Sequence, residues 1–402
     1  MVNRERNNQL LETLKLPENS ECADCGLPDP DWASCKVGVF ICLQCSGVHR
    51  SFTESGKVKS IQLDNWEDER LVQFMIGNGN LKAKKKYEAF VPPFYYRPHA
   101  NDCIALKEQW IRAKYQREEF MSNKVTMHTT ADREGILYKR GRDRKGFQER
   151  RFVLSRSEGL LKYYTKDNGK GPKGIIPIQS LNVMFQGEKI GHQHGLEITY
   201  MKDGQTRNIF VYHDSAEEIV AWYNALREAR LHYLKTTYPQ ASEAELIPKI
   251  TRNYSKVGYM EKTGPKKKEA FKKRWFNLDS GGRKLLYYKN PLDAFEKGGI
   301  FIGSKERGYA VQEGLPQGLK GNNYDCGIII QTPAREFVLT CENVKEQREW
   351  LKALRGVVSQ PMTKEDIIVC SSFILACSMG SVSTCHFRSS GLIHLTFASI
   401  LL

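Results

Sequence analysis

Two pairs of cysteines constrain the fold of this chain more than any other feature of its sequence. Cys22, Cys25, Cys42 and Cys45 follow the pattern C-x2-C-x16-C-x2-C. Two residues between paired cysteines let both sulfurs reach one ion from a tight turn, and two such pairs complete a tetrahedron of thiolates around zinc. Because four thiolates leave no position for water, we expect one structural zinc ion that does no chemistry itself.

The charge of the chain is divided unevenly along its length. Its 402 residues carry a formal net charge of +15. Residues 1–126 hold 18 Lys and Arg against 17 Asp and Glu, whereas residues 127–402 hold 43 against 29. An anionic partner, whether nucleic acid, anionic lipid or inositol phosphate, is therefore expected to bind beyond the cysteines. The nearly neutral cysteine region argues against nucleic acid.

The second part of the chain contains an internal duplication. The segment EGILYKRGRDRKGFQERRFVLSRSEGLLKYY (134–164) resembles VGYMEKTGPKKKEAFKKRWFNLDSGGRKLLYYK (257–289). Each copy has short apolar or aromatic stretches separated by turn residues, which predict strands, and each ends in a helical pattern. Matching positions include Gly135 with Gly258, Phe152 with Phe276, and Trp222 with Trp350.

These patterns predict a multidomain α+β chain with a mostly helical zinc module first. We expect the module at 1–126, a linker at 127–133, strand-rich repeats at 134–233 and 255–358, a second linker at 234–254, and an apolar tail at 359–402. The tail is too diluted by Ser, Cys and Gly to favour a membrane span, so a poorly folded end is expected. The charged N-terminus predicts no secretory signal, and hence a cytoplasmic protein with reduced cysteines.

An arginine follows the last of the four cysteines by five positions. A helix starting at Ser46 or Gly47 would aim His49 and Arg50 outward. The planar, permanently charged guanidinium suits phosphate oxygens, and a rigid metal site beside it could present it to a partner's nucleotide. The alternative is a solvated or salt-bridged side chain, and spacing alone does not decide between the two.

The cysteine pattern and its surroundings resemble the Arf GTPase-activating protein family. The resemblance rests on C-x2-C-x16-C-x2-C-x4-R ending in Arg50, and on the segments DPDWAS, GVFIC, CSGVHRS, KSIQLDNW and the GN of Gly77–Asn78. With two pleckstrin-homology-like (PH-like) repeats behind it, the chain is similar to the dual-PH subfamily, also called centaurin-alpha. The resemblance covers residues 1 to 360 and leaves the tail unassigned.

This resemblance implies a function for the zinc module. It implies a GTPase activator without catalytic activity of its own, in which Arg50 serves as an arginine finger in trans for Arf bound to GTP. Trp32 and the Asp64–Trp66 segment would support the fold or the Arf contact. The alternative is a membrane adaptor that keeps the lipid modules and does not use the finger.

For the repeats, the resemblance implies PH domains that bind inositol phosphates through cations on the first two strands. The implied ligands are Lys139, Arg150 and Tyr163 in the first repeat, and Lys262, Lys272, Arg274 and Tyr288 in the second. The loops add Arg140, Arg142, Arg144 and Lys145, and Lys266, Lys267 and Lys268. Gln148 departs from the cationic pattern, which weakens the first site. The implied partners are phosphatidylinositol 3,4,5-trisphosphate or 4,5-bisphosphate, with inositol tetrakisphosphate as a soluble candidate, and recruitment to the plasma membrane.

Overall fold

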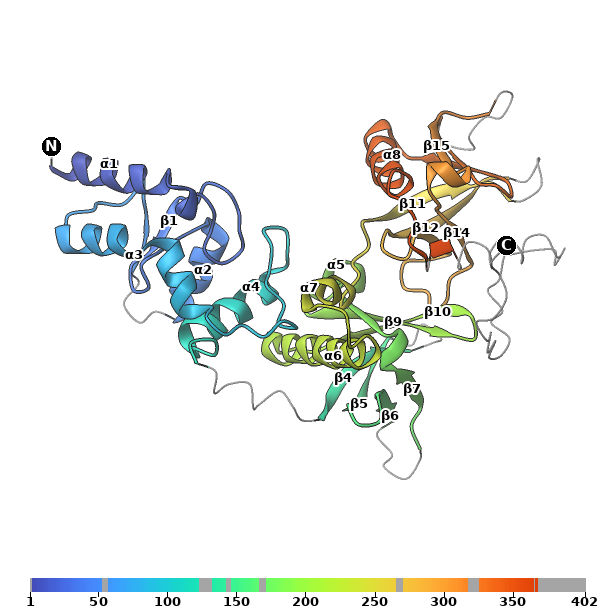
Figure 1. Ribbon diagram of the computed structural model, residues 1–402, viewed down its shortest axis with the longest axis horizontal. Coiled ribbons are helices and arrows are strands. Elements are labelled where there is room, and N and C mark those ends of the chain that lie inside the picture. The colour runs from blue at the N-terminus through green and yellow to red at the C-terminus, as the bar shows by residue number, and fades with distance from the viewer. Residues whose placement is uncertain are drawn as a thin grey trace. The chain divides into compact units, whose positions relative to one another are not determined.

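The computed structural model describes residues 2–52, 57–122, 132–141, 146–165, 171–264, 270–316, 325–364 and 366–367 (Figure 1). The predicted loop cations Arg142, Arg144, Lys145 and Lys266–Lys268, and residues 365 and 368–402 of the apolar tail, lie outside these ranges. Within them, every helix is too short or too polar to span a bilayer. The cysteine module and the two repeats are described below one at a time.

The cysteine module is mostly helical, as expected. A small antiparallel sheet in the order β2-β1-β3 is formed by β1 (Trp32–Ser34), β2 (Val39–Ile41) and β3 (Val58–Ser60). The helices are α1 (Val2–Leu14), the 3-10 turn η1 (Pro17–Asn19), α2 (Leu43–Phe52), α3 (Glu69–Tyr87), and α4 (Ile104–Ile111), which continues into the π-helical turn η2 (Arg112–Gln116).

Two hydrophobic clusters hold this module together. One contains Leu10, Phe40, Trp66 and Met75, which are all wholly buried. The other surrounds the four cysteines with residues such as Trp110. Cys35 belongs to the first cluster, where burial raises the pKa of its thiol to about 11. Cys35 is therefore a small apolar filler outside the group of four cysteines.

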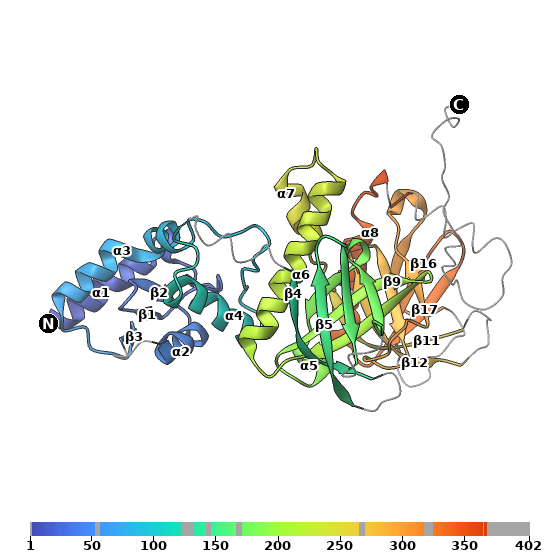
Figure 2. The same cartoon turned by 90° about the horizontal axis from the view of Figure 1, so that it is seen from below.

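The first repeat is one seven-stranded antiparallel sheet followed by a helix. The strands follow the order β7-β6-β5-β4-β10-β9-β8. They are β4 (Arg133–Arg140), β5 (Phe147–Ser155), β6 (Leu160–Tyr164), β7 (Gly174–Pro177), β8 (Asn182–Phe185), β9 (Gly195–Lys202) and β10 (Gln205–Tyr212). The short helix α5 (Gly187–Ile190) precedes β9, and α6 (Ala216–Thr237) covers the sheet (Figure 2).

The second repeat has the same topology, with the order β14-β13-β12-β11-β17-β16-β15. Its elements are β11 (Lys256–Lys262), β12 (Lys272–Asp279), β13 (Lys284–Tyr288), β14 (Gly298–Phe301), β15 (Ala310–Glu313), β16 (Cys326–Gln331), β17 (Glu336–Cys341) and the helix α8 (Val344–Val358). The identical strand order confirms the duplication. Between the repeats lie α7 (Glu243–Leu246) and the turn η5 (Ile247–Lys249).

A glycine on the first strand of each repeat lets a helix tryptophan approach the sheet closely. A Cβ at Gly135 would lie 3.3 Å from Nε1 of Trp222, and one at Gly258 would lie 3.7 Å from Trp350. Both tryptophans are buried, and truncating such a side chain typically costs about 3–5 kcal/mol. The glycine and tryptophan positions that match in the two repeats are therefore two halves of one packing contact.

Candidate zinc centre, arginine site and cationic sheet ends

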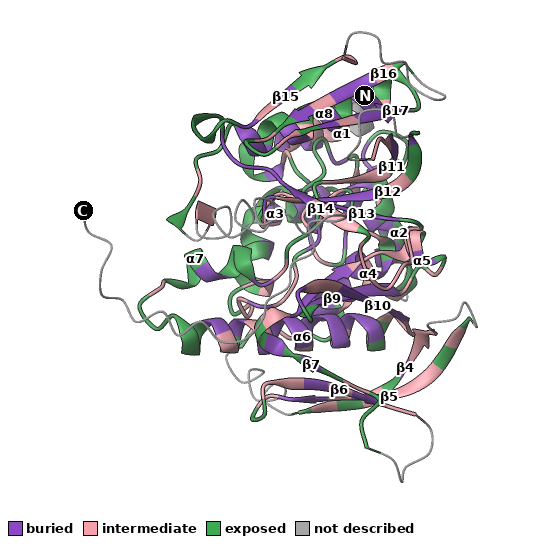
Figure 3. Cartoon of the chain, turned by 90° about the vertical axis from the view of Figure 1, so that its right-hand side faces the viewer, coloured by how far each residue is buried: buried purple, intermediate pink, exposed green. Residues whose placement is uncertain are grey.

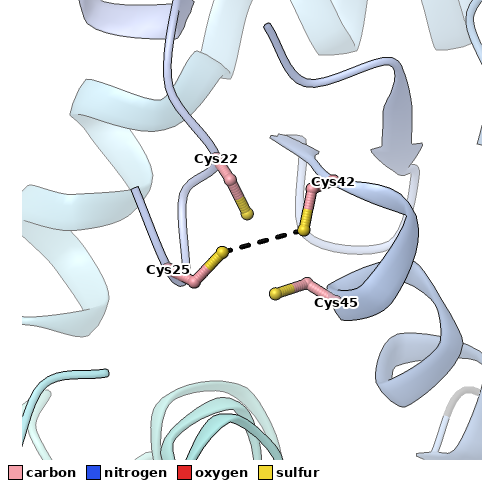
Figure 4. A group of neighbouring side chains, drawn as sticks. All are labelled: Cys22, Cys25, Cys42 and Cys45. Atoms are coloured by element: carbon pink, nitrogen blue, oxygen red, sulfur yellow. Dashed lines mark hydrogen bonds between the residues drawn. The ribbon is translucent and has the colours of Figure 1, made fainter. Parts of the chain in front are cut away.

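The four predicted cysteines converge on one point. Cys22, Cys25, Cys42 and Cys45 are buried, and their sulfurs all lie within 4.8 Å of one another (Figure 4). The Cys25 and Cys42 sulfurs are 3.7 Å apart. In a tetrahedral site with Zn–S bonds of about 2.3 Å, the sulfurs lie about 3.8 Å apart. The donor set and its spacing therefore fit one zinc ion held by four thiolates.

The environment of the sulfurs also suits a metal. Hydrogen bonds from the Cys22, Cys25 and Cys45 thiols lower the pKa of Cys42, whereas contact with Cys25 raises the pKa of Cys22. Four crowded, buried thiols resist simultaneous ionisation unless a cation compensates their charge, and a bound zinc ion supplies that charge. With all four positions taken by sulfur, the metal would be structural.

The second cysteine pair lies where strand β2 passes into helix α2. Cys42 follows the end of β2, and Cys45 lies in the first turn of α2, which begins at Leu43 rather than at Ser46 or Gly47. A metal bound here would fix the start of α2. Any side chain later on this short helix is then held at a defined position relative to the metal.

Arg50 lies on α2 and is exposed, with its guanidinium carbon 4.4 Å from the ring centroid of Trp32. Five residues of α-helix rotate a side chain by about 140°, so Arg50 points away from the Cys45 side. Trp32 is fixed in the sheet between Ile41 and Ser60. Among the residues that the structure describes, no carboxylate forms an ion pair with Arg50.

The prediction that His49 points outward is wrong. His49 is wholly buried, and its Nε2 lies 2.9 Å from Oδ2 of Asp24. Residues four apart share a face of a helix, so a position four after the metal ligand Cys45 must face the interior. The hydrogen bond joins α2 to the first cysteine pair, because Asp24 lies between Cys22 and Cys25.

A buried charge network extends from Asp24. The ammonium of Lys114, which is 1% exposed, lies 3.1 Å from Asp24 and 2.9 Å from Glu88, and donates to the carbonyl of Ala23 at 3.0 Å. Burial alone would raise the pKa of Asp24, but Lys114 and His49 overcome this and lower it to about 2. Lys114 therefore ties η2 and the residue after α3 to the first cysteine pair.

Replacing Lys114 with methionine is expected to destabilise the module by about 3–5 kcal/mol, because the buried carboxylates of Asp24 and Glu88 lose the ammonium that both contact. Chemical denaturation of the full chain, followed through the unfolding transition of the zinc module, measures the change. The matched control is Arg112→Met on the same turn, since the Arg112–Glu108 pair is partly exposed and is worth under about 1 kcal/mol. Equal losses in the two variants would contradict the network's importance.

Asn80, which no sequence motif singles out, joins three parts of the module. Its side-chain oxygen accepts from the Phe40 amide at 2.7 Å, and its nitrogen donates to the carbonyls of Glu21 and Phe40. Gly79 makes this possible by breaking the helical geometry of α3 with a φ of 66°. The second GN of IGNGN, and not Gly77–Asn78, thus carries this structural role.

Asp64 and Trp66, which also carry the family resemblance, make hydrogen bonds within the fold of the module. Asp64 accepts from the Ser60 amide at 2.7 Å, and the Trp66 indole donates to the Ser60 carbonyl at 3.1 Å. Trp66 is wholly buried. This segment therefore closes a turn directly beside Trp32, the strand partner of Ser60.

In the first repeat, the predicted ligands Lys139, Arg150 and Tyr163 share the inner face of the sheet. Lys139 lies opposite Gln148, with its ammonium 5.0 Å from the Tyr163 ring centroid. Arg150 donates to the carbonyl of Glu149 at 2.7 Å and to the Gln148 side chain. The structure therefore brings these three residues together, and Gln148 bonds the arginine instead of adding a cation.

In the second repeat, Lys262 lies directly opposite Lys272, and Arg274 lies on the same face opposite Met260. Like charges directly opposite each other destabilise a sheet, and the Lys262 ammonium here donates to the carbonyl of Thr263 at 2.7 Å. The Lys262 ammonium lies 4.9 Å from the ring centroid of Tyr287.

The choice of Tyr288 as a ligand is wrong by one residue. Tyr287 pairs with Phe276 just as Tyr163 pairs with Phe152, whereas Tyr288 faces the other side and is wholly buried. Successive side chains on a strand point to opposite faces, so a register error of one residue moves a hydroxyl away from the site. Tyr287 is the residue that occupies the position of Tyr163.

Comparison with known families agrees with this organisation. Residues 7–124 match the family described as GTPase activating protein for Arf, and residues 131–230 and 254–359 match the PH domain family. The fold, the cysteine cluster and these matches define a class: a regulator of a small GTPase, built from a zinc-finger module and two PH domains.

Close relatives narrow the class further. Arf-GAP with dual PH domain-containing protein 2 of Homo sapiens is 61% identical over 366 residues, covering 90% of this chain and 96% of the relative. The protein of the same name from Rattus norvegicus is 61% identical over 375 residues, covering 92% and 99%. The chain belongs to the family of Arf GTPase-activating proteins with dual PH domains, which regulate a GTPase rather than catalyse a reaction of their own.

Proposed function

We propose that this chain accelerates GTP hydrolysis on membrane-bound Arf, with Arg50 as the arginine finger supplied in trans. One observation carries the proposal: an exposed guanidinium rests 4.4 Å over Trp32, beside the cysteine cluster. No carboxylate among the described residues neutralises it. An arginine held on a rigid platform and left without an anionic partner is preorganised to bind a negatively charged target.

The chemistry follows from where charge develops in the reaction. During GTP hydrolysis, negative charge grows on the oxygens of the transferred phosphoryl group and the leaving diphosphate, and a finger that stabilises it raises the rate by roughly 10³–10⁵. Zinc, when bound, supplies only a rigid junction between the Cys42 turn and α2. Single-turnover hydrolysis on vesicle-bound Arf–GTP, comparing the unmodified chain with Arg50→Lys, tests this function.

The inner-face cations of both PH domains support the second half of the proposal. Lys139 with Arg150, and Lys262 with Lys272 and Arg274, bind the phosphates of phosphatidylinositol trisphosphate or bisphosphate and recruit the chain to the plasma membrane. Inositol tetrakisphosphate is the soluble ligand of the same chemistry. Basic residues at an anionic surface contribute about 1 kcal/mol each, and two weak sites on one chain gain avidity.

The second PH domain is expected to bind the headgroup more tightly than the first, because Lys272 replaces Gln148 at the matching position. Lys272→Gln should weaken binding of inositol tetrakisphosphate to the second site by about tenfold, since a charge-assisted hydrogen bond is lost. Gln148→Lys should strengthen the first site by a similar factor. Isothermal titration calorimetry on the full chain resolves both changes.

Lys273→Gln is the matched control for this pair. Lys273 is the next residue on β12, opposite Glu261, and therefore points to the other face of the sheet. Its replacement should leave headgroup affinity within about twofold, because bulk charge alone has a small local effect. Equal losses from Lys272→Gln and Lys273→Gln would show that net charge, not the inner-face site, binds the ligand.

A further inference from the structure

The second PH domain contains two cysteines, Cys326 and Cys341, and they lie directly opposite each other on neighbouring strands. Cys326 is the first residue of β16, and Cys341 is the last residue of β17. Figure 3 shows these two strands side by side. The first repeat has the same strand order and contains no cysteine. The fold therefore does not need a thiol at either position, and the pair is a feature of the second domain alone.

The strand register brings the two cysteines within the distance that a disulfide spans. The carbonyl of Gly327 accepts from the Gly314 amide at 2.9 Å, on the side away from β17. Because backbone groups alternate in direction along a strand, the neighbouring Cys326 directs its own amide and carbonyl toward Cys341. Such a hydrogen-bonded pair has Cα atoms about 5.5 Å apart, and disulfides join Cα atoms about 4.4–6.8 Å apart. Both cysteines are free thiols in the structure.

The two side chains also share one face of the sheet, since residues directly opposite each other project to the same side. Cys341 is wholly buried in the core of the domain, and Cys326 is half-buried and packs against that core. Burial raises the pKa of the Cys341 thiol to about 12, so this thiol stays protonated near neutral pH. An oxidant dissolved in water therefore reaches the pair through Cys326.

We propose that Cys326 and Cys341 are an oxidation site, at which hydrogen peroxide converts the two thiols into a cross-strand disulfide. The Cys326 thiolate attacks one peroxide oxygen, which breaks the O–O bond, forms a sulfenic acid and releases hydroxide. The Cys341 sulfur then attacks the Cys326 sulfur, the S–O bond breaks, and the departing hydroxide takes the Cys341 proton and leaves as water. The proton that Cys326 gave up neutralises the first hydroxide, so one peroxide and two thiols yield one disulfide and two waters. This site does not depend on the proposed headgroup binding or GTPase activation.

The disulfide would stabilise the folded second PH domain. It closes the chain from residue 326 to residue 341, and a cross-link over such a segment removes conformational freedom from the unfolded chain. The β16–β17 hairpin is already formed with both thiols free, so the bond fits the existing fold. The melting temperature of the second PH domain should therefore rise by about 10 °C on oxidation, and reduction with dithiothreitol should reverse the rise.

Treatment of the reduced full chain with hydrogen peroxide tests the site. The remaining thiols are then alkylated, and mass spectrometry of the digested chain is expected to find a linked peptide pair that joins residues 326 and 341 and has lost two hydrogen atoms. Calorimetry on the same sample should show the higher melting temperature. Cys326→Ser should abolish both signals, whereas Cys103→Ser, which removes a half-buried thiol from the zinc module, should keep both.

Three results would overturn the proposal. A Cys326 thiol that stays reduced would show that peroxide does not reach it, and a Cys326 that becomes a sulfinic acid without a linked peptide would show that the two sulfurs do not meet. A bond from Cys326 to one of the tail cysteines, which lie outside the described residues, would assign the partner thiol to the tail (Cys370, Cys377 and Cys385). If Cys326→Ser loses cooperative unfolding, Cys326→Ala makes the same comparison.

Discussion

Arg50→Lys is expected to slow Arf-dependent GTP hydrolysis by at least about 100-fold, and a full loss of the finger would cost roughly 10³–10⁵. Lysine keeps the charge but loses the planar fork that binds two oxygens at once, and its compact, strongly hydrated ammonium is a poorer partner for the Trp32 ring. The guanidinium lies 4.4 Å from that ring, so its position depends on shape as well as charge. Single-turnover hydrolysis on myristoylated Arf with phosphoinositide vesicles measures the loss.

Arg70→Lys is the matched control for this substitution. Arg70 is an exposed arginine in the first turn of α3, in the same module and without a contact to the metal site among the described residues. The control should keep the rate of the unmodified chain. Vesicle binding should be identical for the unmodified chain and both variants. Equal hydrolysis rates for all three proteins would exclude the arginine-finger role and favour the non-catalytic adaptor.

The cysteine cluster and the duplication could be predicted from the sequence because both depend on regular spacing. Two C-x2-C turns can reach one ion wherever the chain between them runs, so the geometry in Figure 4 follows from the pattern alone. A repeat shows itself by self-similarity, and glycine and tryptophan at matching positions mark the same contact in each copy.

The two wrong predictions, for His49 and Tyr288, depend on where a helix begins and on which residues pair across a hairpin. The sequence alone does not give either. A helix starting at Ser46 or Gly47 predicts an outward His49, but α2 begins at Leu43, so Cys45 and His49 lie four residues apart on one helical face. Tyr288 lies one residue beyond the equivalent of Tyr163, because the β5–β6 and β12–β13 hairpins have the same register and Tyr287 is the residue opposite the matching phenylalanine. Both errors are small shifts along the chain, and each reverses which face of an element a side chain occupies.

Asn80 and Lys114 were missed for a different reason. Their roles come from contacts between segments far apart in the sequence: Asn80 reaches Glu21 and Phe40, and Lys114 reaches Asp24. A polar residue inside a helical pattern ordinarily indicates an exposed face, so no local signal distinguishes these two. Only the tertiary fold shows that they are buried and paired.

Removing zinc is expected to unfold the cysteine module while leaving the second PH domain folded. Binding free energies of structural zinc sites reach about 10–16 kcal/mol near neutral pH, which exceeds the stability of most small domains. The four cysteines lie within one of the two hydrophobic clusters of the module, whereas the core of the second PH domain contains none of them. Calorimetry with and without a chelator should therefore show one transition lost and another retained.

Two substitutions, Cys45→Ser and Cys35→Ser, distinguish the loss of a zinc ligand from the loss of a buried thiol outside the metal site. Both side chains are buried in the same module, but Cys35 lies outside the tetrahedron, in the cluster with Phe40 and Trp66. Serine at position 45 removes a thiolate from the site and should lower the zinc content well below one per chain, with loss of Arf stimulation because α2 no longer holds Arg50 beside Trp32. Serine at position 35 should keep the zinc and the activity at a modest cost in stability, since it buries a hydroxyl where a thiol was packed.

A folded, metal-free chain that still stimulates hydrolysis would mean that the sheet alone positions the arginine, and the metal would then have no part in the mechanism.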